Sequence, residues 1–466
     1  MLAAKLSMAR AVGSISRRSG RGATSLPGRV LMRLDGHAIA RLGARLAGGS
    51  VVLSATNGKT TTAAMAASIL KRARREVVHN RAGANMAGGI ASTLLAAAGP
   101  GATMAGDLGL FEVDEFFLAG VVDELSPRLL VLGNLFRDQL DRYGELESIA
   151  DRWAQTVQRH PPDQLGLALN ADDPLVADLG RDRGGVLYFG VDDDRLALEG
   201  LAHASDSKHC RRCGSPYRYS AVYLGHLGHY ECPVCGARRP TPSVVAENVV
   251  LQGVRSSRFA LRTPDGRAEV HLPLPGLYNV YNALAAAALA LSLEVSLSDV
   301  VSGLEATRPA FGRSESVRLG ERELAILLVK NPAGANEVLR TLALEPGQHD
   351  LLGILNDNAA DGRDVSWIWD ADFETVASRL RRVTCAGTRA PELALRLKYA
   401  GVEPESIRVE ADLARAVDGA LADLPPVAPR SEPAITPPVY ALPTYTAMLA
   451  LRELLRARGQ VSSSWS

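Results

Sequence analysis

The sequence has almost no net charge, few cysteines and no long apolar run, and each shortage argues against a class of protein. Its 52 basic and 51 acidic side chains leave a formal charge of +1, which does not favour a nucleic-acid partner. No apolar run approaches the ~20 residues that span a bilayer, and Lys5 and Arg10 interrupt the apolar stretch that a secretory signal needs. We therefore expect a cytoplasmic protein.

The rest of the composition is that of a folded chain with more than one core. Hydrophobic residues make up 47% of the 466 residues and charged residues 22%, as in globular proteins. A chain of this length usually forms two or three domains. Alternating strand and helix patterns favour α/β domains with parallel sheets. Strands are predicted at 50–54, 108–113, 129–132, 165–169, 324–329, 351–355, 382–385 and 439–442, with a helix at 61–74.

A phosphate-binding loop is predicted directly after the first of these strands. Residues 54–61 read S-A-T-N-G-K-T-T and lead into an Ala-rich helix. Backbone N–H groups at a helix start bind phosphate, Lys59 can bridge β- and γ-phosphates, and the Thr60 hydroxyl can bind Mg²⁺. Leu53 stands where the longer P-loop pattern has its first glycine, so that pattern fits imperfectly. The alternative, an ordinary turn, is disfavoured by the strand before it and the helix after it.

Four of the five cysteines form two Cys-x-x-Cys pairs, and the fifth, Cys385, stands alone in an apolar stretch. The two pairs are separated by 18 residues. Two such knuckles make a tetrahedral zinc site of the closed, structural type. Redox chemistry and four unrelated thiols are the alternatives. The predicted zinc ligands are Cys210, Cys213, Cys232 and Cys235, within an inserted zinc-ribbon module at 203–240.

Several segments, taken in order, resemble those of Mur ligases and folylpolyglutamate synthases. The loop at 55–61 is similar to their short T-N-G-K-T-T loop, and Glu112 at a strand end matches an acid that binds Mg²⁺. The segment 134–144 resembles their Asn…Asp-His-x-Asp motif, 276–283 resembles a helix start whose second Asn meets adenine, and 311–315 resembles the hinge before the third domain. The resemblance implies an ATP-dependent carbon–nitrogen ligase with a Mur-ligase-like central P-loop domain.

The resemblance also implies which residues bind the nucleotide and its metal. ATP would be bound by Thr56, Asn57, Gly58, Lys59, Thr60, Thr61, Asn282, Arg313 and Lys330, and Mg²⁺ by Thr60 and Glu112. Two departures from the family's sequence pattern leave open whether a second Mg²⁺ binds. Gln139 stands where the family has a metal-binding His, and residues 144–160 contain no lysine that could be carbamylated.

The C-terminal third contains a polar loop with two tryptophans after a strand. Residues 355–370 read L-N-D-N-A-A-D-G-R-D-V-S-W-I-W-D, and α/β folds place sites on such loops. Trp367 and Trp369 would be costly to expose without a partner; the alternative is a capped loop with both rings against the sheet. With 384–392 and 443–449, this loop and the zinc module resemble the MurT family, Mur-ligase-like subunits of lipid II isoglutaminyl synthase.

Membership of that family would imply a reaction shared between two subunits. One subunit uses ATP to activate the α-carboxylate of D-glutamate in the lipid II stem peptide as an acyl phosphate, and ammonia then gives D-isoglutamine. A GatD-type glutaminase supplies the ammonia, and Asp364 occupies the position that completes the partner's Cys–His pair. The cysteines of this chain agree with the need for a separate glutaminase subunit. A glutaminase needs a Cys activated by a His, and beyond the predicted zinc ligands this chain has only Cys385, with no His nearby in sequence.

Three parts are therefore expected along the chain. They are a basic helical arm at 1–48, a Mur-ligase central ATP-binding domain at 49–312 and a C-terminal Rossmann-like domain at 313–466 that contacts the glutaminase. The first 50 residues carry nine Lys or Arg against the single acid Asp35, and a helix is expected to end near 26–28. The arm either contacts anionic lipid near a lipid-linked substrate or packs on the central domain.

Two other functions stay open from the sequence. One is a Mur-type or folylpolyglutamate-type ligase that adds an amino acid rather than ammonia. The other is a non-catalytic scaffold in which ATP closes the domains around a partner.

Overall fold

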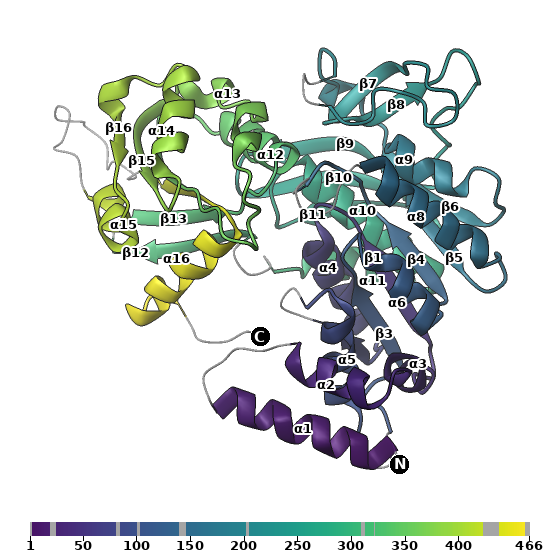
Figure 1. Cartoon of the computed structure of the whole chain (residues 1–466). Helices are drawn as coiled ribbons and strands as arrows, with labels where there is room; N and C mark the ends of the chain where they lie inside the picture. The colour runs from purple at the N-terminus through teal and green to yellow at the C-terminus, as the bar shows by residue number, and fades with distance from the viewer. Residues whose placement is uncertain are drawn as a thin grey trace.

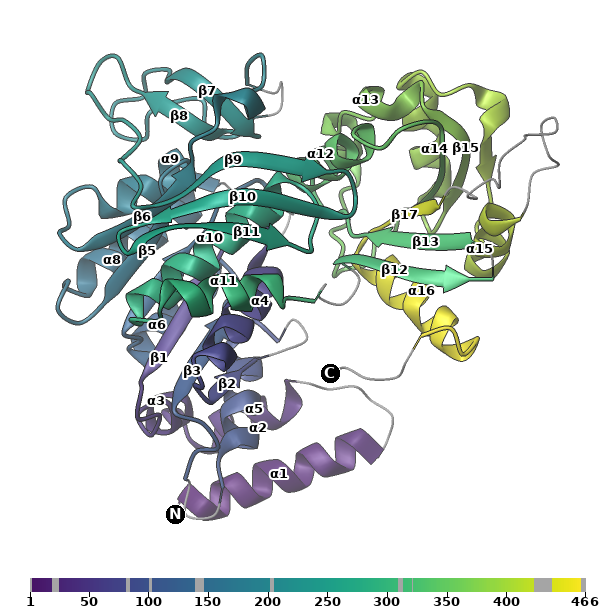
Figure 2. The same ribbon diagram turned by 180° about the vertical axis from the view of Figure 1, so that it is seen from behind.

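The computed structural model describes residues 2–18, 25–80, 84–99, 103–138, 146–201, 205–308, 313–320, 322–422 and 438–461. It contains two α/β lobes, each built on its own sheet, and a small hairpin that projects from the larger lobe (Figure 1). The view from behind shows the same two lobes side by side (Figure 2). This arrangement confirms the predicted fold class.

The larger lobe is built on a nine-stranded sheet in the order β11-β10-β9-β6-β5-β4-β1-β3-β2. Its neighbours are parallel from β9 to β2, whereas β9, β10 and β11 pair antiparallel. The four strands predicted in this lobe correspond to β1, β3, β4 and β5, which are parallel as expected, whereas the antiparallel edge was not predicted. The strands are β1 (Ser50–Ser54), β2 (Val77–His79), β3 (Leu108–Glu112), β4 (Leu129–Leu132), β5 (Gly166–Asn170), β6 (Val186–Val191), β9 (Val244–Gln252), β10 (Ser256–Thr263) and β11 (Gly266–Leu272).

Helices cover both faces of this sheet, so its central strands are apolar on both sides. Along β1, Val51 and Leu53 join one hydrophobic cluster and Val52 joins the other, as the alternation of a strand requires. The first cluster includes α4 (Lys59–Arg72), α10 (Leu277–Ser292) and α11 (Leu297–Glu305); the second includes α5 (Ala87–Ala97), α6 (Leu118–Leu125) and α8 (Leu146–Arg159). The short α9 (Pro174–Ala177) follows β5.

The smaller lobe contains a six-stranded sheet in the order β12-β13-β17-β14-β15-β16, parallel except for the β12–β13 pair. All four strands predicted here are present. The elements are β12 (Arg313–Leu319), β13 (Arg322–Leu327), α12 (Pro332–Ala343), β14 (His349–Ile354), α13 (Glu374–Ala377), β15 (Leu380–Ala386), α14 (Ala390–Tyr399), β16 (Ile407–Val409), α15 (Leu413–Leu421), β17 (Val439–Pro443) and α16 (Tyr445–Ala457). The Pro-rich segment 425–438, which the sequence predicts to be a surface loop between the last helix and the last strand, lies outside the described residues except for Pro438.

The N-terminal arm is three helices rather than one: α1 (Leu2–Arg18), α2 (Leu26–Leu34) and α3 (Ala38–Gly43). A helix was expected to end near 26–28, but α2 begins there with Pro27 in its first turn. Proline is tolerated at that position because its missing N–H has no partner in the helix. Gly28 lets α2 approach α5 closely, since a Cβ at Gly28 would lie 2.0 Å from the carbonyl oxygen of Gly88.

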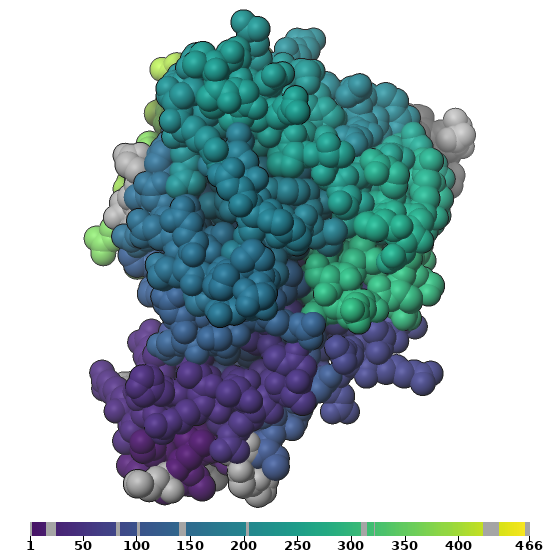
Figure 3. Space-filling model, turned by 90° about the vertical axis from the view of Figure 1, so that its right-hand side faces the viewer, coloured from purple at the N-terminus to yellow at the C-terminus, as the bar shows by residue number. Residues whose placement is uncertain are grey.

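The first helix packs on the fold through its apolar side chains. Leu6 and Ala9 are fully buried, Lys5 pairs with Asp35 at 3.3 Å, and Arg10 donates to the carbonyl of Leu95 at 3.2 Å. The arm lies at one end of the larger lobe, opposite the projecting hairpin (Figure 3). Across the described part of the chain, no helix is both long enough and apolar enough to cross a bilayer.

Candidate nucleotide site and metal centre

The phosphate loop connects β1 to α4, and its glycine is required by geometry. Gly58 has φ +89°, in the left-handed region that favours glycine, and α4 begins at the next residue. A Cβ at Gly58 would lie 2.0 Å from the side-chain oxygen of Asn282 on α10. The predicted adenine-side asparagine therefore lies directly against the phosphate loop, and any side chain at Gly58 would separate the two.

A cavity of about 380 Å³ opens above this loop, between the two lobes. Eight of the nine residues predicted to bind ATP line it: Thr56, Asn57, Gly58, Lys59, Thr60, Thr61, Asn282 and Lys330. The ninth, Arg313, is the first residue of β12, and its side chain lies outside the described part of the structure. Gln139 also lies outside the described residues. The structure thus brings together residues that are up to 274 positions apart in sequence, the separation between Thr56 and Lys330.

Lys59 is held inside the loop by its own chain. Its Nζ donates to the carbonyl of Ala55 at 2.5 Å and lies 2.7 Å from a carboxylate oxygen of Glu115. Burial alone would lower the pKa of Lys59, but the nearby carboxylates of Glu115, Asp114 and Asp138 raise it above its usual value. Burial would likewise raise the pKa of Glu115, and the ammonium groups of Lys59 and Lys330 lower it. Lys59 and Glu115 are therefore both charged at neutral pH.

Lys330 reaches the same loop from the smaller lobe. Its Nζ donates to the carbonyl of Thr56 at 3.1 Å and pairs with Asp138. Two lysines from two lobes thus converge on one loop, each neutralised by an acid. Because ammonium groups stabilise phosphoryl oxygens, this is an arrangement suited to a transferring phosphate.

The carboxylates that line the cavity do not include Glu112, which the sequence predicts to bind Mg²⁺. Glu112 lies at the end of β3 and is 1% exposed, and its backbone N–H donates to the side chain of Asn80 at 2.9 Å. Asp114, Glu115 and Asp138 line the cavity, whereas Glu112 is not among its described lining residues. The segment L-F-E-V-D-E contains three acids just beyond a strand, and sequence alone could not rank them, because the turn after β3 decides which ones face the cavity.

These residues fit a nucleotide with its metal ion. A left-handed glycine leads into a helix start, and both lysines and carboxylates line the cavity. Phosphate oxygens suit the backbone N–H groups and lysines. Mg²⁺ prefers the hydroxyl and carboxylate oxygens that Thr60 and the neighbouring acids provide.

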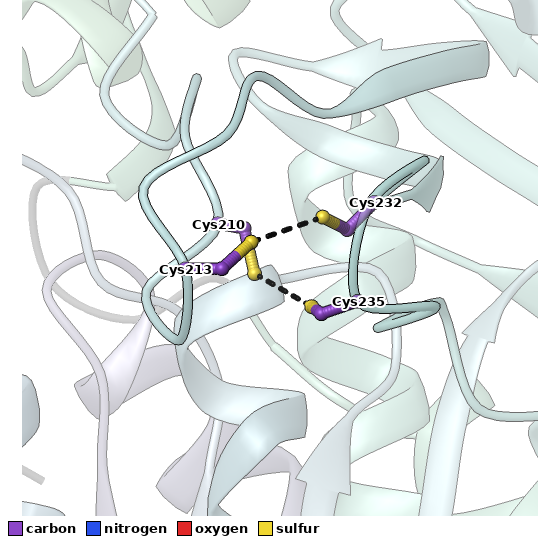
Figure 4. A group of neighbouring side chains, drawn as sticks. All are labelled: Cys210, Cys213, Cys232 and Cys235. Atoms are coloured by element: carbon purple, nitrogen blue, oxygen red, sulfur yellow. Dashed lines mark hydrogen bonds between the residues drawn. The ribbon is translucent and has the colours of Figure 1, made fainter.

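The four paired cysteines meet in the projecting module, where the first knuckle contacts the larger lobe through the ion pairs Arg211–Asp151 and Arg212–Asp178. This module joins β6 to β9 and contains the antiparallel strands β7 (Arg218–Leu224) and β8 (Leu227–Glu231). The four Sγ atoms lie within 4.8 Å of one another, with two from each knuckle facing the other two (Figure 4). Tetrahedral zinc with Zn–S of ~2.3 Å puts its sulfurs ~3.8 Å apart. The donor set therefore fits Zn²⁺, with no fifth side chain needed.

Asp172, which is fully buried, connects this module to the nucleotide lobe. It accepts hydrogen bonds from Arg239 at 2.6 Å, from the hydroxyl of Tyr281 at 2.7 Å and from the backbone N–H of Val191 at 2.8 Å. Arg239 follows the second knuckle, and Tyr281 precedes Asn282 on α10. The module is thus fixed to the helix that faces the phosphate loop.

Asp364 is exposed on the loop after β14 and is not among the cavity-lining residues, although Ala360 of the same loop is. Its carboxylate accepts from the backbone N–H of Ser366 at 2.8 Å, and hydrogen bonds from Ser366 lower its pKa. Trp367 packs against the lobe core, whereas Trp369 is 49% exposed beside Tyr399, with ring centroids 5.8 Å apart. The packed-loop alternative therefore holds for one tryptophan only.

Cys385 cannot act as a nucleophile in this structure. It is fully buried in β15, and burial raises the pKa of its thiol to about 12. A thiol is an effective nucleophile as the thiolate. All five cysteines of the sequence lie among the described residues, and the other four form the cluster described above.

Solved structures share this fold at low sequence identity. A pseudomurein peptide ligase type C from Methanothermus fervidus has a TM-score of 0.63 and 23% identity, covering 88% of this chain and 78% of its own. MurF from Acinetobacter baumannii has a TM-score of 0.62 and 18% identity, covering 92% and 80%. Folylpolyglutamate synthase from Mycobacterium tuberculosis has a TM-score of 0.59 and 16% identity, covering 90% and 94%.

Sequence comparisons narrow the relationship further. The model of the Mur ligase middle domain matches residues 54–232, and the model of the MurT ligase C-terminal domain matches residues 328–448. The MurT subunit of the glutamine-hydrolysing lipid II isoglutaminyl synthase of Streptococcus pneumoniae is 34% identical over 442 residues, covering 95% of this chain and 94% of its own. The Staphylococcus aureus MurT subunit is 34% identical over 410 residues, covering 88% and 90%. The chain belongs to the MurT family and has the Mur-ligase fold.

Proposed function

We propose that this chain is the ATP-dependent subunit of a lipid II isoglutaminyl synthase. It would convert the α-carboxylate of D-glutamate in the lipid II stem peptide to the amide of D-isoglutamine. The nitrogen would come from glutamine, hydrolysed by a GatD-type partner. The proposal rests on family membership and on one geometric observation, the convergence of Lys59 and Lys330 on the phosphate loop.

The two lysines suit the first half of the reaction. A carboxylate oxygen of the substrate attacks the γ-phosphorus of ATP, ADP leaves, and an acyl phosphate forms. Catalysis of this step is mainly positioning and charge stabilisation. Lys59 faces the loop that would hold the β- and γ-phosphates, and Lys330 approaches from the opposite lobe. Thr60 would hold Mg²⁺ together with a carboxylate from the segment after β3, where Glu112 is the predicted ligand and Asp114 and Glu115 are the acids that line the cavity. The bound ion would supply positive charge next to the phosphate oxygens.

The second half of the reaction needs ammonia as the nucleophile, and this chain has no accessible thiol outside the four-cysteine cluster to release it from glutamine. The nitrogen of ammonia attacks the acyl carbon, inorganic phosphate leaves with its oxygen, and the nitrogen loses a proton. Releasing ammonia from glutamine requires a Cys–His pair. Cys385 is buried, and the other four cysteines form the cluster whose geometry fits zinc. Asp364 is exposed, ionised and on a surface loop, which suits a carboxylate that orients a partner's histidine.

We propose that the reaction takes place in the cytoplasm, at the inner face of the membrane, where a lipid-linked substrate is accessible. Lys5, Arg10 and Arg41 bind residues of the fold, so a contact of the arm with anionic lipid would be made by its other basic side chains. Co-sedimentation with anionic vesicles, with and without residues 1–25, tests it. Unchanged binding after the deletion would rule the arm out.

The experiment that tests the function is reconstitution. The full chain and a GatD-type glutaminase are mixed with lipid II, ATP, Mg²⁺ and glutamine, and the stem peptide is analysed by mass spectrometry. We expect amidation that needs every component. Addition of an amino acid instead of an amide would favour the Mur-type alternative, and ATP-dependent assembly without any product would favour a scaffold.

A further inference from the structure

Two asparagine side chains from different lobes bind each other beside the nucleotide cavity. The amide nitrogen of Asn331 donates to the side-chain oxygen of Asn57 at 3.0 Å, and the amide nitrogen of Asn57 donates back to the oxygen of Asn331 at 3.3 Å. Asn57 lies in the phosphate loop, and Asn331 directly precedes α12 of the smaller lobe. Residues 274 positions apart therefore form one reciprocal amide pair.

Each asparagine is also held within its own lobe. The backbone N–H and carbonyl of Asn57 bind the side chain of Asn134 at 2.9 and 3.1 Å. Asn331 is 2% exposed, and its oxygen also accepts from the backbone N–H of Gly334 at 2.9 Å, so it caps α12. The pair thus joins a fixed point on the loop to a fixed point on a helix.

The neighbour of Asn331 in sequence is Lys330, which donates to the carbonyl of Thr56 in the same loop. Lys330 and Asn331 together contact two consecutive residues of the phosphate loop. Both contacts require the smaller lobe to lie over the loop. Both also require this backbone shape of the loop, because it sets where the carbonyl of Thr56 and the side chain of Asn57 lie.

We propose that Asn331 is a positioning residue that couples the approach of the smaller lobe to the shape of the phosphate loop. When the lobe closes, Asn331 binds Asn57, keeps the loop in its phosphate-binding conformation and sets where Lys330 enters the site. The inference rests on the proposed function for its catalytic consequence. Its structural part, control of the loop by the opposite lobe, does not depend on the substrate.

The capping role of Asn331 can be separated from the pairing role. In Asn331→Ser, serine still caps α12 but is too short to bind Asn57. Hydrogen exchange of the full chain should then be faster at residues 55–62 and unchanged at 335–343. Asp412→Ser, which exchanges the cap of α15 in the same lobe, should change neither segment. Exchange that is unchanged at 55–62, or faster only in α12, would overturn the proposal.

A double-mutant cycle gives the kinetic test. In the reconstituted enzyme, Asn57→Ala and Asn331→Ser should each lower kcat for amidation about tenfold, the scale of losing two neutral hydrogen bonds. If the residues act as a pair, the double variant should be no slower than the slower single variant. Effects that multiply would show that the two residues act separately, and would contradict the proposal.

The two hypotheses fail in different ways. If the wild-type complex does not amidate lipid II, the proposed function is wrong. The exchange experiment on the chain alone still decides whether Asn331 controls the phosphate loop.

Discussion

The ammonium nitrogen of Lys59 lies 2.7 Å from a carboxylate oxygen of Glu115, and both side chains are buried next to the phosphate loop. The pKa of Glu115 is lowered and that of Lys59 is raised, so the pair is ionic at neutral pH. A nucleotide phosphate must therefore compete with Glu115 for Lys59. The loop is kept neutral until the ligand arrives, which avoids a buried unpaired cation.

Lys59→Ala should abolish amidation. The variant removes the ammonium group that the phosphate loop itself carries, and losing a charge that stabilises a transition state costs ~10²–10³-fold in rate. Product formation by the reconstituted enzyme measures this. Lys71→Ala, an exposed lysine of the same helix, is the matched control and should behave as wild type. Normal amidation by Lys59→Ala would refute the assignment of the loop.

Glu112→Gln and Glu115→Gln should act on different ligands. Glu112 is proposed to bind Mg²⁺, so Glu112→Gln should raise the half-saturating Mg²⁺ concentration at least about tenfold. Glu115 binds Lys59, so Glu115→Gln should change the KM for ATP instead. Titrations of Mg²⁺ and ATP against amidation rate separate the two. A Mg²⁺ effect confined to Glu115→Gln would transfer the metal assignment to that residue.

Cys232→Ser should lose the metal and destabilise the projecting module. Cys232 is fully buried in the cluster, and structural zinc contributes directly to folding. We expect about one zinc per wild-type chain by elemental analysis, a strong loss in Cys232→Ser, and a lower Tm. Cys385→Ala removes the remaining cysteine and should keep the zinc. Wild-type protein with no zinc and four freely titrating thiols would exclude the site.

Asp364→Asn should lower glutaminase turnover strongly while ATP binding stays intact. An Asn cannot stabilise the imidazolium of the partner's histidine as a carboxylate does. Ammonia release by the complex and nucleotide affinity of the chain are measured together. Asp418→Asn, an exposed acid of α15 in the same lobe, is the control. Full glutaminase turnover in Asp364→Asn would show that Asp364 does not orient the partner's histidine.

Asp350→Asn should destabilise the smaller lobe. The buried carboxylate of Asp350 pairs with Arg322, Arg381 and Arg382 at 2.6 to 3.0 Å. Removing it leaves three cations partly buried and should cost about 3–5 kcal/mol, against less than about 1 kcal/mol for Asp418→Asn on the surface. Urea unfolding measures both.

The same residue gives a pH dependence with a definite sign. Burial would raise the pKa of Asp350, and the arginines lower it below its ordinary value of 3.8. A lowered folded pKa stabilises the protein above pH 3.8, and this stability is lost as the pH falls through the folded pKa. Asp350→Asn should therefore weaken the dependence of stability on pH below about 4. An unchanged acid transition would contradict this.

The parts of the fold that the sequence predicted are those with local signals. Periodic apolar strands located both sheets, and the pattern around Gly58 and Lys59 located the nucleotide cavity. The start of α2 at Pro27 was read as the end of a helix, because proline marks either boundary and only packing against α5 decides which. The carboxylates facing the cavity and the Asn57–Asn331 pair depend on how segments far apart in sequence meet, and no local pattern encodes that.

The most direct test of the proposed function follows the transfer of nitrogen from glutamine to lipid II. The full chain, a GatD-type glutaminase, lipid II, ATP and glutamine labelled with ¹⁵N in its side-chain amide are combined, and the stem peptide is analysed by mass spectrometry. If this chain is the ATP-dependent subunit, ¹⁵N should appear in the α-amide of D-isoglutamine, and only when both subunits and ATP are present. Attachment of an amino acid, or an unlabelled and unchanged D-glutamate after ATP has been consumed, would contradict the proposed function.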